Sequence, residues 1–254
     1  MELTIGLLLF GAGLAGGVAN AIAGGATLIT FPAMLAAGLP PVLANASNAV
    51  AVTPGHLIAA CADRHVLPPA DPRMLAAILA VLLGGTVGAV LLLITPERLF
   101  TLLVPALIGV ATVIFAFARP IQRSIAQAFG DTPSQPVATR AALLVPTAIY
   151  GGYFGAGSGV MLLAILSVTG REDLRSANAF KNLLASAVSA VTIVIFTVQG
   201  VVHWPDTLVM LTGAMCGGYL GGLLIKVLTP SVGRAVVIAF GVGMTVLYAY
   251  RYWM

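Results

Sequence analysis

One stretch of this chain occurs twice, 133 positions apart. The segment 44–46 (Ala-Asn-Ala) returns as 177–179, and Gly24 returns as Gly157. The glycines at 84, 85 and 88 return, without a gap, at 217, 218 and 221. Three matches in a single register indicate an internal duplication. Because the repeated unit is apolar yet contains asparagines, the sequence predicts a membrane transporter built from two halves around a central polar site.

Composition places most of the surface in lipid. Hydrophobic residues make up 59% of the chain and charged residues 8%, against about 45–50% and about 25% in soluble domains. An apolar helix of about 20 residues crosses a bilayer, so a chain of this length has room for at most about eight spans. The segment Met1–Leu3 lacks the basic region of a cleavable signal peptide. We therefore expect it to remain in the mature protein.

Each half contains one long, glycine-interrupted apolar stretch followed by three plain ones. The long stretches cover 3–37 and 138–169 and should each form two helical pieces with a break. The plain stretches predict transmembrane helices over 42–62, 71–94 and 98–118 in a first repeat (1–118), and over 174–199, 205–228 and 230–252 in a second repeat (138–254). A polar linker, 119–137, separates them. The expected fold is an all-α polytopic membrane protein.

The placement of basic residues predicts how the broken stretches sit. If both crossed the membrane fully, the twelve basic residues would divide six against six. If each returns to its own side as a re-entrant hairpin, all except Arg98 and Arg251 lie on one side, as the positive-inside rule requires. Each half then crosses three times, so the two repeats are inverted. We expect six full spans, two hairpins, a cytoplasmic linker and both termini on the opposite side.

The hairpin tips are the first candidate binding elements. Backbone N–H groups at a helix N-terminus attract anions, and glycines let a ligand approach the backbone closely. The two candidate tips are Gly24-Gly25-Ala26-Thr27 and Gly157-Ser158-Gly159. The alternative is that these glycines only allow tight helix packing, the role that we assign to glycines 84, 85, 88 and 217–222.

Polar residues follow each hairpin at spacings that place them on one helix face. They are Asn45 and Asn48 in the first half, and Asn178, Lys181 and Asn182 in the second. Polar groups inside a bilayer need partners, so we expect this row, together with Asn20 of the first broken stretch, to face a cavity. Lys181 stands at the repeat position of Asn48 and adds a positive charge that suits an anion. Alternatively, it extends to the membrane interface.

Two further observations concern whether transport is coupled to an ion. His56 follows Thr53-Pro54-Gly55 inside an apolar run; it could relay protons or donate to a carbonyl freed by Pro54. All eight acidic residues lie in loops or at span ends, so we expect no buried carboxylate to bind a proton or sodium ion. Export of an anion needs no coupling ion, because an inside-negative potential contributes about 2.3 kcal/mol per charge per 100 mV.

Other classes of protein do not fit. Residues 156–159 (Ala-Gly-Ser-Gly) resemble the Gly-x-Ser-Gly of intramembrane serine proteases but lack the first glycine, and no histidine is placed to act as the base. There is no zinc-protease or phosphate-loop motif. Cys61 and Cys216 have no metal-ligand spacing, and the basic residues are scattered over short loops. We expect no enzyme, cofactor, metal site or nucleic-acid partner.

The motifs resemble one known family. The run 16–25 (GGVANAIAGG), continuing through Phe31-Pro32 and Pro40-Pro41 to 44–48 (ANASN), is similar to the first repeat of the TauE/SafE family of sulfite and organosulfonate exporters. The segments 178–183 (NAFKNL) and 200–204 (GVVHW) are similar to its second repeat. Ala26 departs from the pattern where a third glycine is frequent, and Ser158 interrupts the second glycine cluster. The resemblance implies a bacterial inner-membrane permease with periplasmic termini, for small anions such as sulfite, sulfoacetate or taurine.

The mechanism expected from these observations is alternating access, by rocking of one repeat against the other. The anion would lie between the two tips, with asparagine amides donating hydrogen bonds and Lys181 providing the opposite charge. A passive anion channel and a non-transporting membrane scaffold or partner subunit remain as alternatives. The expected partners are the anion and the lipid bilayer, and a homodimer is compatible with the sequence.

Overall fold

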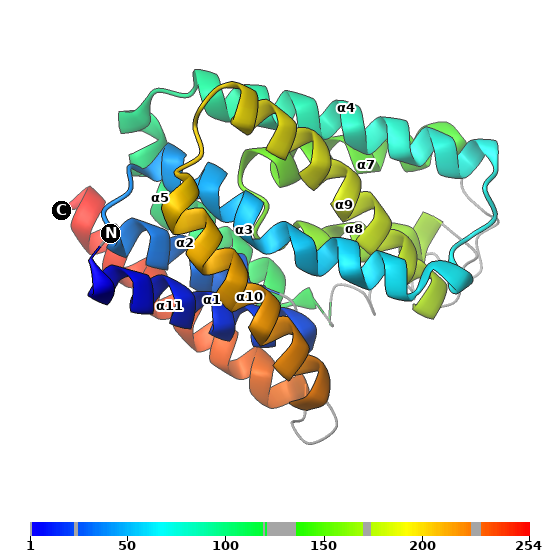
Figure 1. Cartoon of the computed structure of the whole chain (residues 1–254). Coiled ribbons are helices and arrows are strands. Elements are labelled where there is room, and N and C mark those ends of the chain that lie inside the picture. The colour runs from blue at the N-terminus through cyan, green and yellow to red at the C-terminus, as the bar shows by residue number, and fades with distance from the viewer. Residues whose placement is uncertain (1, 23–24, 119, 121–135, 170–173, 225–229) are drawn as a thin grey trace.

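The computed structural model describes residues 2–22, 25–118, 120, 136–169, 174–224 and 230–254. All regular structure among them is helical, which confirms the expected all-α class. Both termini lie at the same end of the bundle (Figure 1). The elements are α1 (Leu3–Ile22), α2 (Thr27–Ala36), α3 (Pro41–Ala62), the short η1 (Arg64–Val66), α4 (Pro72–Ile94), α5 (Glu97–Ala116), α7 (Val137–Tyr153), α8 (Ser158–Thr169), α9 (Leu174–Val198), α10 (Trp204–Leu224) and α11 (Pro230–Trp253).

Each long apolar stretch forms two helices that fold back on each other. In the first, α2 packs on α1, and a Cβ on Gly16 would lie only 2.6 Å from the methyl group of Thr30. In the second, α8 packs on α7, and a Cβ on Gly151 would lie 3.5 Å from Cβ of Ser158. Each stretch is thus a hairpin with a long first arm and a short second arm.

The long arm of each hairpin packs against a helix from the other half of the chain. Gly13 and Gly17 of α1 face Met210 and Ala214 of α10, so α1 and α10 run parallel. In the same way, α4 packs parallel to α7. These two pairs have the most extensive contacts between helices in the described part of the chain. They join the two halves of the sequence into one bundle.

Glycines make these close pairs. A Cβ on Gly88 would clash with the backbone of Ile149, and one on Gly217 with the backbone of Leu14. Small residues let helix backbones approach closely in membrane proteins. The packing role predicted for these glycines is therefore confirmed, and the same holds for Gly84, Gly85 and Gly221. It is wrong for Gly218 and Gly222, where an added Cβ would meet open space.

Six helices of the described residues are long and apolar enough to cross a membrane. Five of them, α4, α5, α9, α10 and α11, lie where full spans are expected, but the sixth is α1 rather than α3. The polar side chains of α3, among them Asn45, Asn48 and His56, lower its hydropathy. With 20 residues, α1 is about 30 Å long, the thickness of a bilayer core. A hairpin that enters only half of the bilayer would need a shorter first arm than α1.

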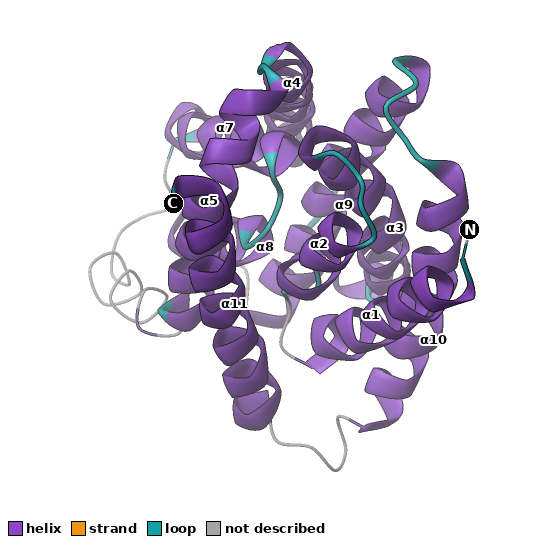
Figure 2. Cartoon of the chain, turned by 90° about the vertical axis from the view of Figure 1, so that its left-hand side faces the viewer, coloured by secondary structure: helices purple, strands orange, loops and turns teal. Residues whose placement is uncertain are grey.

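The short arms occupy the middle of the bundle. Every residue of α2 from Leu28 to Leu35 is buried, as expected of an interior helix. Figure 2 shows α2 and α8 among the longer helices. The ring of Phe31 on α2 meets that of Phe154, in the turn after α7, edge-on with 5.3 Å between centroids. The two hairpins therefore contact each other in the interior.

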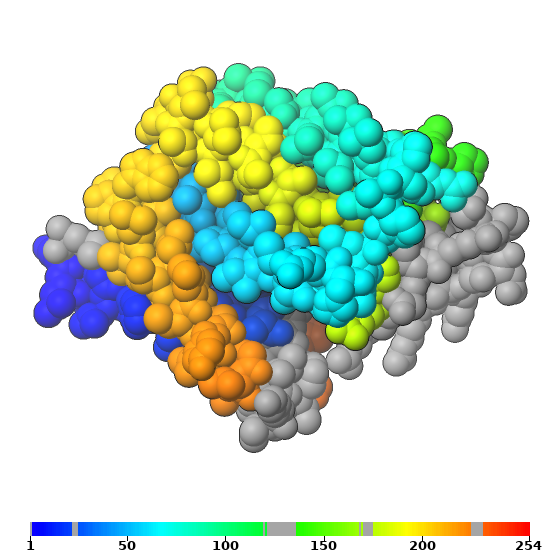
Figure 3. Space-filling model, turned by 45° about the vertical axis from the view of Figure 1, so that its right-hand side comes forward, coloured from blue at the N-terminus to red at the C-terminus, as the bar shows by residue number. Residues whose placement is uncertain are grey.

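The helix that follows each hairpin packs against its counterpart from the other half. These helices, α3 and α9, lie side by side on one face, between α10 and α4 (Figure 3). At one end of α3, the backbone N–H of Val42 donates to Oε1 of Glu97 at 3.1 Å. At the other end, Arg175 lies 3.5 Å from Asp63. These contacts hold α3 beside α5 and α9 and so position its polar face.

Candidate functional site

The turn between α7 and α8 is built by glycines and local hydrogen bonds. Gly155 and Gly157 have φ values of 83° and 80°, which side chains other than glycine rarely adopt. The hydroxyl of Ser158 donates to the carbonyl of Gly155 at 2.7 Å, and that of Tyr150 donates to the carbonyl of Ala156 at 2.8 Å. These bonds satisfy carbonyl groups of the turn and hold it in a fixed shape.

The N–H groups at the start of α8 are in a different situation. No acceptor is recorded among the described residues for the backbone N–H groups of Gly157 and Gly159. Unpaired N–H groups and the helix dipole make this end of α8 positive. Ser158, between the two glycines, lines a cavity. The start of α8 therefore brings a positive helix end to the edge of a hollow space.

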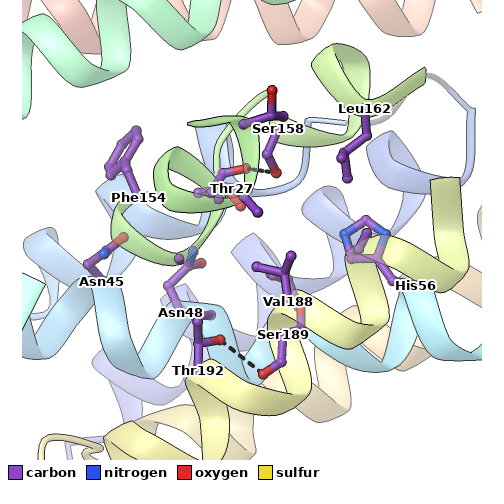
Figure 4. Close-up of a pocket in the computed structure, with 18 of the residues that line it drawn as sticks. Thr27, Asn45, Asn48, His56, Phe154, Ser158, Leu162, Val188, Ser189 and Thr192 are labelled. Atoms are coloured by element: carbon purple, nitrogen blue, oxygen red, sulfur yellow. Dashed lines mark hydrogen bonds between the residues drawn. The ribbon is translucent and has the colours of Figure 1, made fainter. Parts of the chain in front are cut away.

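In this cavity, the volume that the centres of water-sized molecules can occupy is about 60 Å³. One water needs only about 10–15 Å³ by this measure, so the space can hold several waters or a small ligand. The walls come from α2, α3, α7, α8, α9 and the turn after α7 (Figure 4). The polar residues of the lining are Thr27, Asn45, Asn48, His56, Thr147, Ser158, Ser189 and Thr192.

Two asparagines on α3 provide amide groups to the lining. Asn45 is 2% exposed and donates from Nδ2 to the carbonyl of Tyr153, the last residue of α7, at 2.9 Å. Asn48 is 1% exposed. The side-chain oxygens of both residues are buried and have no hydrogen-bond partner among the residues that the structure describes. These oxygens are closed off from solvent, and unsatisfied acceptors of this kind are uncommon in native structures.

Of the residues predicted for the site, Asn45, Asn48, Ser158 and His56 line this cavity. No hydrogen bond from His56 to a carbonyl is recorded in the described part of the chain. Gly24 lies outside the described residues. The cavity lining does not include the other predicted residues, which are Asn20, Gly25, Gly157, Gly159, Asn178, Lys181 and Asn182. Whether any of them binds substrate stays a prediction.

The structure shows where several of these residues lie instead. Gly25 has a φ of 89° and faces Phe115 and Val237. The amide nitrogen of Asn20 packs against Gly55, and Asn182 is buried in α9. Gly157 packs against α5. None of these residues lines the cavity.

Lys181 does not line the cavity. Its ammonium group donates to Oδ1 of Asn178 at 2.9 Å, one turn earlier on α9. Its side chain passes α8 at Gly159, where an added Cβ would lie 4.0 Å from the Lys181 Cδ. The positive charge is thus partly buried beside the N-terminal end of α8.

Three hydroxyl residues of the lining, Thr147, Ser189 and Thr192, were not predicted. For Ser189 a signal existed, because it stands 133 positions after His56 and is therefore its repeat counterpart. Thr147 and Thr192 donate to carbonyls at 3.1 Å and 2.9 Å within their own helices, as many helical threonines do. Nothing in the sequence separates such residues from ordinary helix positions.

Among the acidic residues that the structure describes, one carboxylate is buried, which corrects the expectation that none would be. Asp206, in the first turn of α10, is 6% exposed, and its Oδ2 lies 3.0 Å from Nδ1 of His203. The backbone N–H of His203 donates to the hydroxyl of Ser47 at 2.9 Å, which joins the segment before α10 to α3. Asp206 does not line the cavity. Among the described residues, no group of three or more His, Cys, Asp or Glu side chains could hold a metal ion.

Comparison with known proteins identifies the family. The model of the sulfite exporter TauE/SafE family matches residues 9–248. The chain belongs to this family. The resemblance seen in the motifs of both halves is thus confirmed over nearly the whole sequence. No solved structure matches the chain significantly.

Relatives in three bacteria are similar over most of their length. A probable membrane transporter protein of Haemophilus influenzae is 27% identical, over 98% of this chain and 97% of its own. The probable membrane transporter protein YfcA of Escherichia coli K12 is 28% identical, over 88% of this chain and 81% of its own. The probable membrane transporter protein ORF9 of a Sinorhizobium species is 29% identical, over 84% and 80%. This TauE/SafE protein is a multi-pass membrane transporter and not an enzyme.

Proposed function

We propose that this protein is a secondary transporter that exports small sulfur-containing anions, such as sulfite or organosulfonates, by alternating access. One observation carries the proposal. Thr27 and Ser158, the first residues of α2 and α8, both line the same cavity, so the N-terminal ends of two short helices meet there. Each helix N-terminus carries about half a positive charge. Half-helices that point their N-termini at an anionic substrate are a recurring arrangement in transporters.

Lys181 supports the anionic character of the substrate. Its ammonium group is held beside the start of α8 by Asn178, so a full positive charge lies close to the cavity wall. A charge in the interior of a membrane protein usually marks a substrate or ion pathway. The arrangement favours a small anion over a cation or a neutral solute.

The repeat indicates how the site would alternate. The described cavity lies between Asn45 and Asn48 of α3 and the second hairpin. If the two repeats exchanged conformations, a corresponding site would open between α9 and the first hairpin. That site would be lined by the remaining predicted residues, Asn20, Gly24, Gly25, Asn178, Lys181 and Asn182. The parallel pairs α1–α10 and α4–α7 each join a helix of the first repeat to one of the second, and glycines pack them tightly. These pairs would therefore move as rigid units, in place of the expected rocking of one whole repeat against the other.

Orientation and direction belong to the same proposal. The protein would lie in the bacterial inner membrane as two inverted repeats, with both termini periplasmic and most basic residues cytoplasmic. The adjacent termini in Figure 1 are compatible with this orientation. Export is favoured because the membrane potential already drives anions outward. The family description, sulfite exporter, agrees with this direction.

The test is transport by the purified full chain in proteoliposomes. Labelled sulfite or a labelled sulfonate should enter or leave the vesicles, and unlabelled substrate on the far side should accelerate the exchange. Acceleration from the far side identifies a carrier, whereas flux without it identifies a passive channel. The absence of flux for every anion would leave a scaffold or partner subunit and overturn the proposal.

A further inference from the structure

The contact between α4 and α9 has a counterpart in the other half of the sequence. In the repeat register of 133 positions, α10 corresponds to α4 and α3 corresponds to α9. The structure brings α4 against α9 and α10 against α3. If the two repeats had the same conformation, these two contacts would be alike residue by residue. A difference between them therefore shows how the repeats differ in this conformation.

The α4–α9 contact is closed in the middle of α4. A Cβ on Gly85 would lie 3.1 Å from Cγ1 of Val191 and 3.3 Å from Cγ1 of Val188. Val188 is only 6% exposed, and Ala89, one turn after Gly85, is completely buried. This face of α4 is thus packed inside the protein.

The α10–α3 contact is open at the corresponding positions. Gly218 corresponds to Gly85, but a Cβ on Gly218 would have no heavy atom of the described residues within 4 Å. Ile58 corresponds to Val191 and is 57% exposed on α3. The two residues that would complete the contact are therefore both present, and they lie apart.

The two helices separate along their length. At its start α10 is held to α3, because the N–H of His203 donates to the hydroxyl of Ser47. From there α3 and α10 diverge, away from the end of the bundle that holds both termini (Figures 1 and 3). His56, two residues before Ile58, lines the cavity. The part of α3 that has separated from α10 therefore borders the candidate site.

We propose that the α3–α10 contact is a gate to the site, which is open in this conformation and closes when Gly218 packs against Ile58. The α4–α9 contact of Gly85 with Val191 would open in the same step, because inverted repeats exchange conformations between the two states of a transporter. This inference rests on the alternating access of the proposed function and specifies which contacts control it. In the proposed orientation the open gate faces the cytoplasm, the side from which an exporter takes its substrate.

The experiment is disulfide trapping in the full chain. Cys61 and Cys216 are first replaced by alanine, because both thiols are exposed. Ile58→Cys and Gly218→Cys are then combined; both positions are open, so neither substitution should disturb folding. A disulfide needs Cβ atoms about 3.8 Å apart. The open space around Gly218 prevents this bond in the present conformation, so it can form only when the gate closes.

Oxidation should join the two cysteines within one molecule and abolish flux, and a reductant should restore it. Flux is measured in proteoliposomes with labelled sulfoacetate, because sulfite itself cleaves disulfides. The control combines Ile58→Cys with Leu220→Cys, on the same helix as Gly218. Leu220 corresponds to Val87, which stays 46% exposed although α4 packs against α9. Position 220 should therefore face lipid with the gate open or closed, so this pair should not crosslink and should keep its flux.

The outcomes separate this inference from the proposed function. If Ile58→Cys and Gly218→Cys do not crosslink in a chain that transports the anion, the gate is wrong and transport stands. If they crosslink without loss of flux, the contact is not part of the transport cycle, and the inference is again overturned. Crosslinking in a chain that carries neither sulfoacetate nor sulfite supports the closing of α10 onto α3 and overturns the proposed function.

Discussion

The ammonium group of Lys181 donates a 2.9 Å hydrogen bond to the side-chain oxygen of Asn178, one turn earlier on α9. In the repeat register these two residues correspond to Asn48 and Asn45. The first-half pair lines the cavity, whereas the second-half pair bonds internally and lies beside the start of α8. Equivalent positions of a duplicated sequence thus play different parts in this conformation.

Replacing Lys181 tests its role as the opposite charge. Lys181→Met keeps most of the side-chain volume and removes the charge, so anion affinity should fall by at least about tenfold, in line with a cost of about 2 kcal/mol or more for a buried charge partner. The measurement is concentration-dependent flux in proteoliposomes. Lys181→Arg, which keeps the charge, should retain more transport than Lys181→Met. Undiminished flux in Lys181→Met would remove Lys181 from the site.

The contact between Asn45 and Tyr153 predicts a stability effect. Asn45→Leu leaves the terminal carbonyl of α7 without its side-chain donor, which should cost about 1–3 kcal/mol. Thermal unfolding in detergent should show a lower melting temperature for this variant than for Thr53→Val. The Thr53 hydroxyl donates to the carbonyl of Ala49 within α3, so its loss breaks no contact between helices. Similar melting temperatures for both would show that the link between α3 and α7 contributes little.

Adjacent glycines on α10 form a matched pair for helix packing. An added Cβ clashes with the backbone of Leu14 at Gly217, whereas at Gly218 it meets open space. Gly217→Ala should therefore destabilise the protein by about 1–3 kcal/mol through overpacking. Gly218→Ala should be neutral or slightly stabilising, because alanine favours helix. The readout is the fraction that remains monodisperse after heating. Equal sensitivity at both positions would contradict the close contact between α1 and α10.

Reporter fusions test the proposed orientation. With both termini periplasmic, alkaline phosphatase joined after Met254 should be active, and a green fluorescent protein at the same place should stay dark. The same reporters inserted in the linker 119–137 should give the reverse result, because the basic residues predict that it is cytoplasmic. Fluorescence at the C-terminus would show that the orientation is the reverse of the proposed one, or that the number of crossings differs.

Much of the helical pattern was predictable, because its signals are local. Apolar runs, proline pairs and glycine clusters predicted where helices occur and where the long stretches break. The spacing of Asn45 and Asn48 placed them on one face, and both line the cavity. That α1 is long enough to cross a membrane was not foreseen, because the positions of the basic residues predicted a hairpin that returns to its own side.

The site itself was only partly predictable, because a cavity depends on which side chains meet from different helices. Asp206 stands at the start of a span in the sequence, and its burial depends on tertiary packing that no local pattern shows. Thr147 and Thr192 resemble ordinary helix positions and become lining residues only through the packing of α7 and α9 around the second hairpin.

The sequence by itself determined that this protein is an all-helical membrane protein of a duplicated family, with two broken elements and polar helix faces next to them. Those properties follow from hydropathy, periodicity and repeat register, which are read along the chain. Only the tertiary structure decided that the cavity forms on the side of Asn45 and Asn48 and leaves Lys181 paired with Asn178. The two repeats offer nearly equivalent faces, and only the packing of distant helices makes one of them line the cavity.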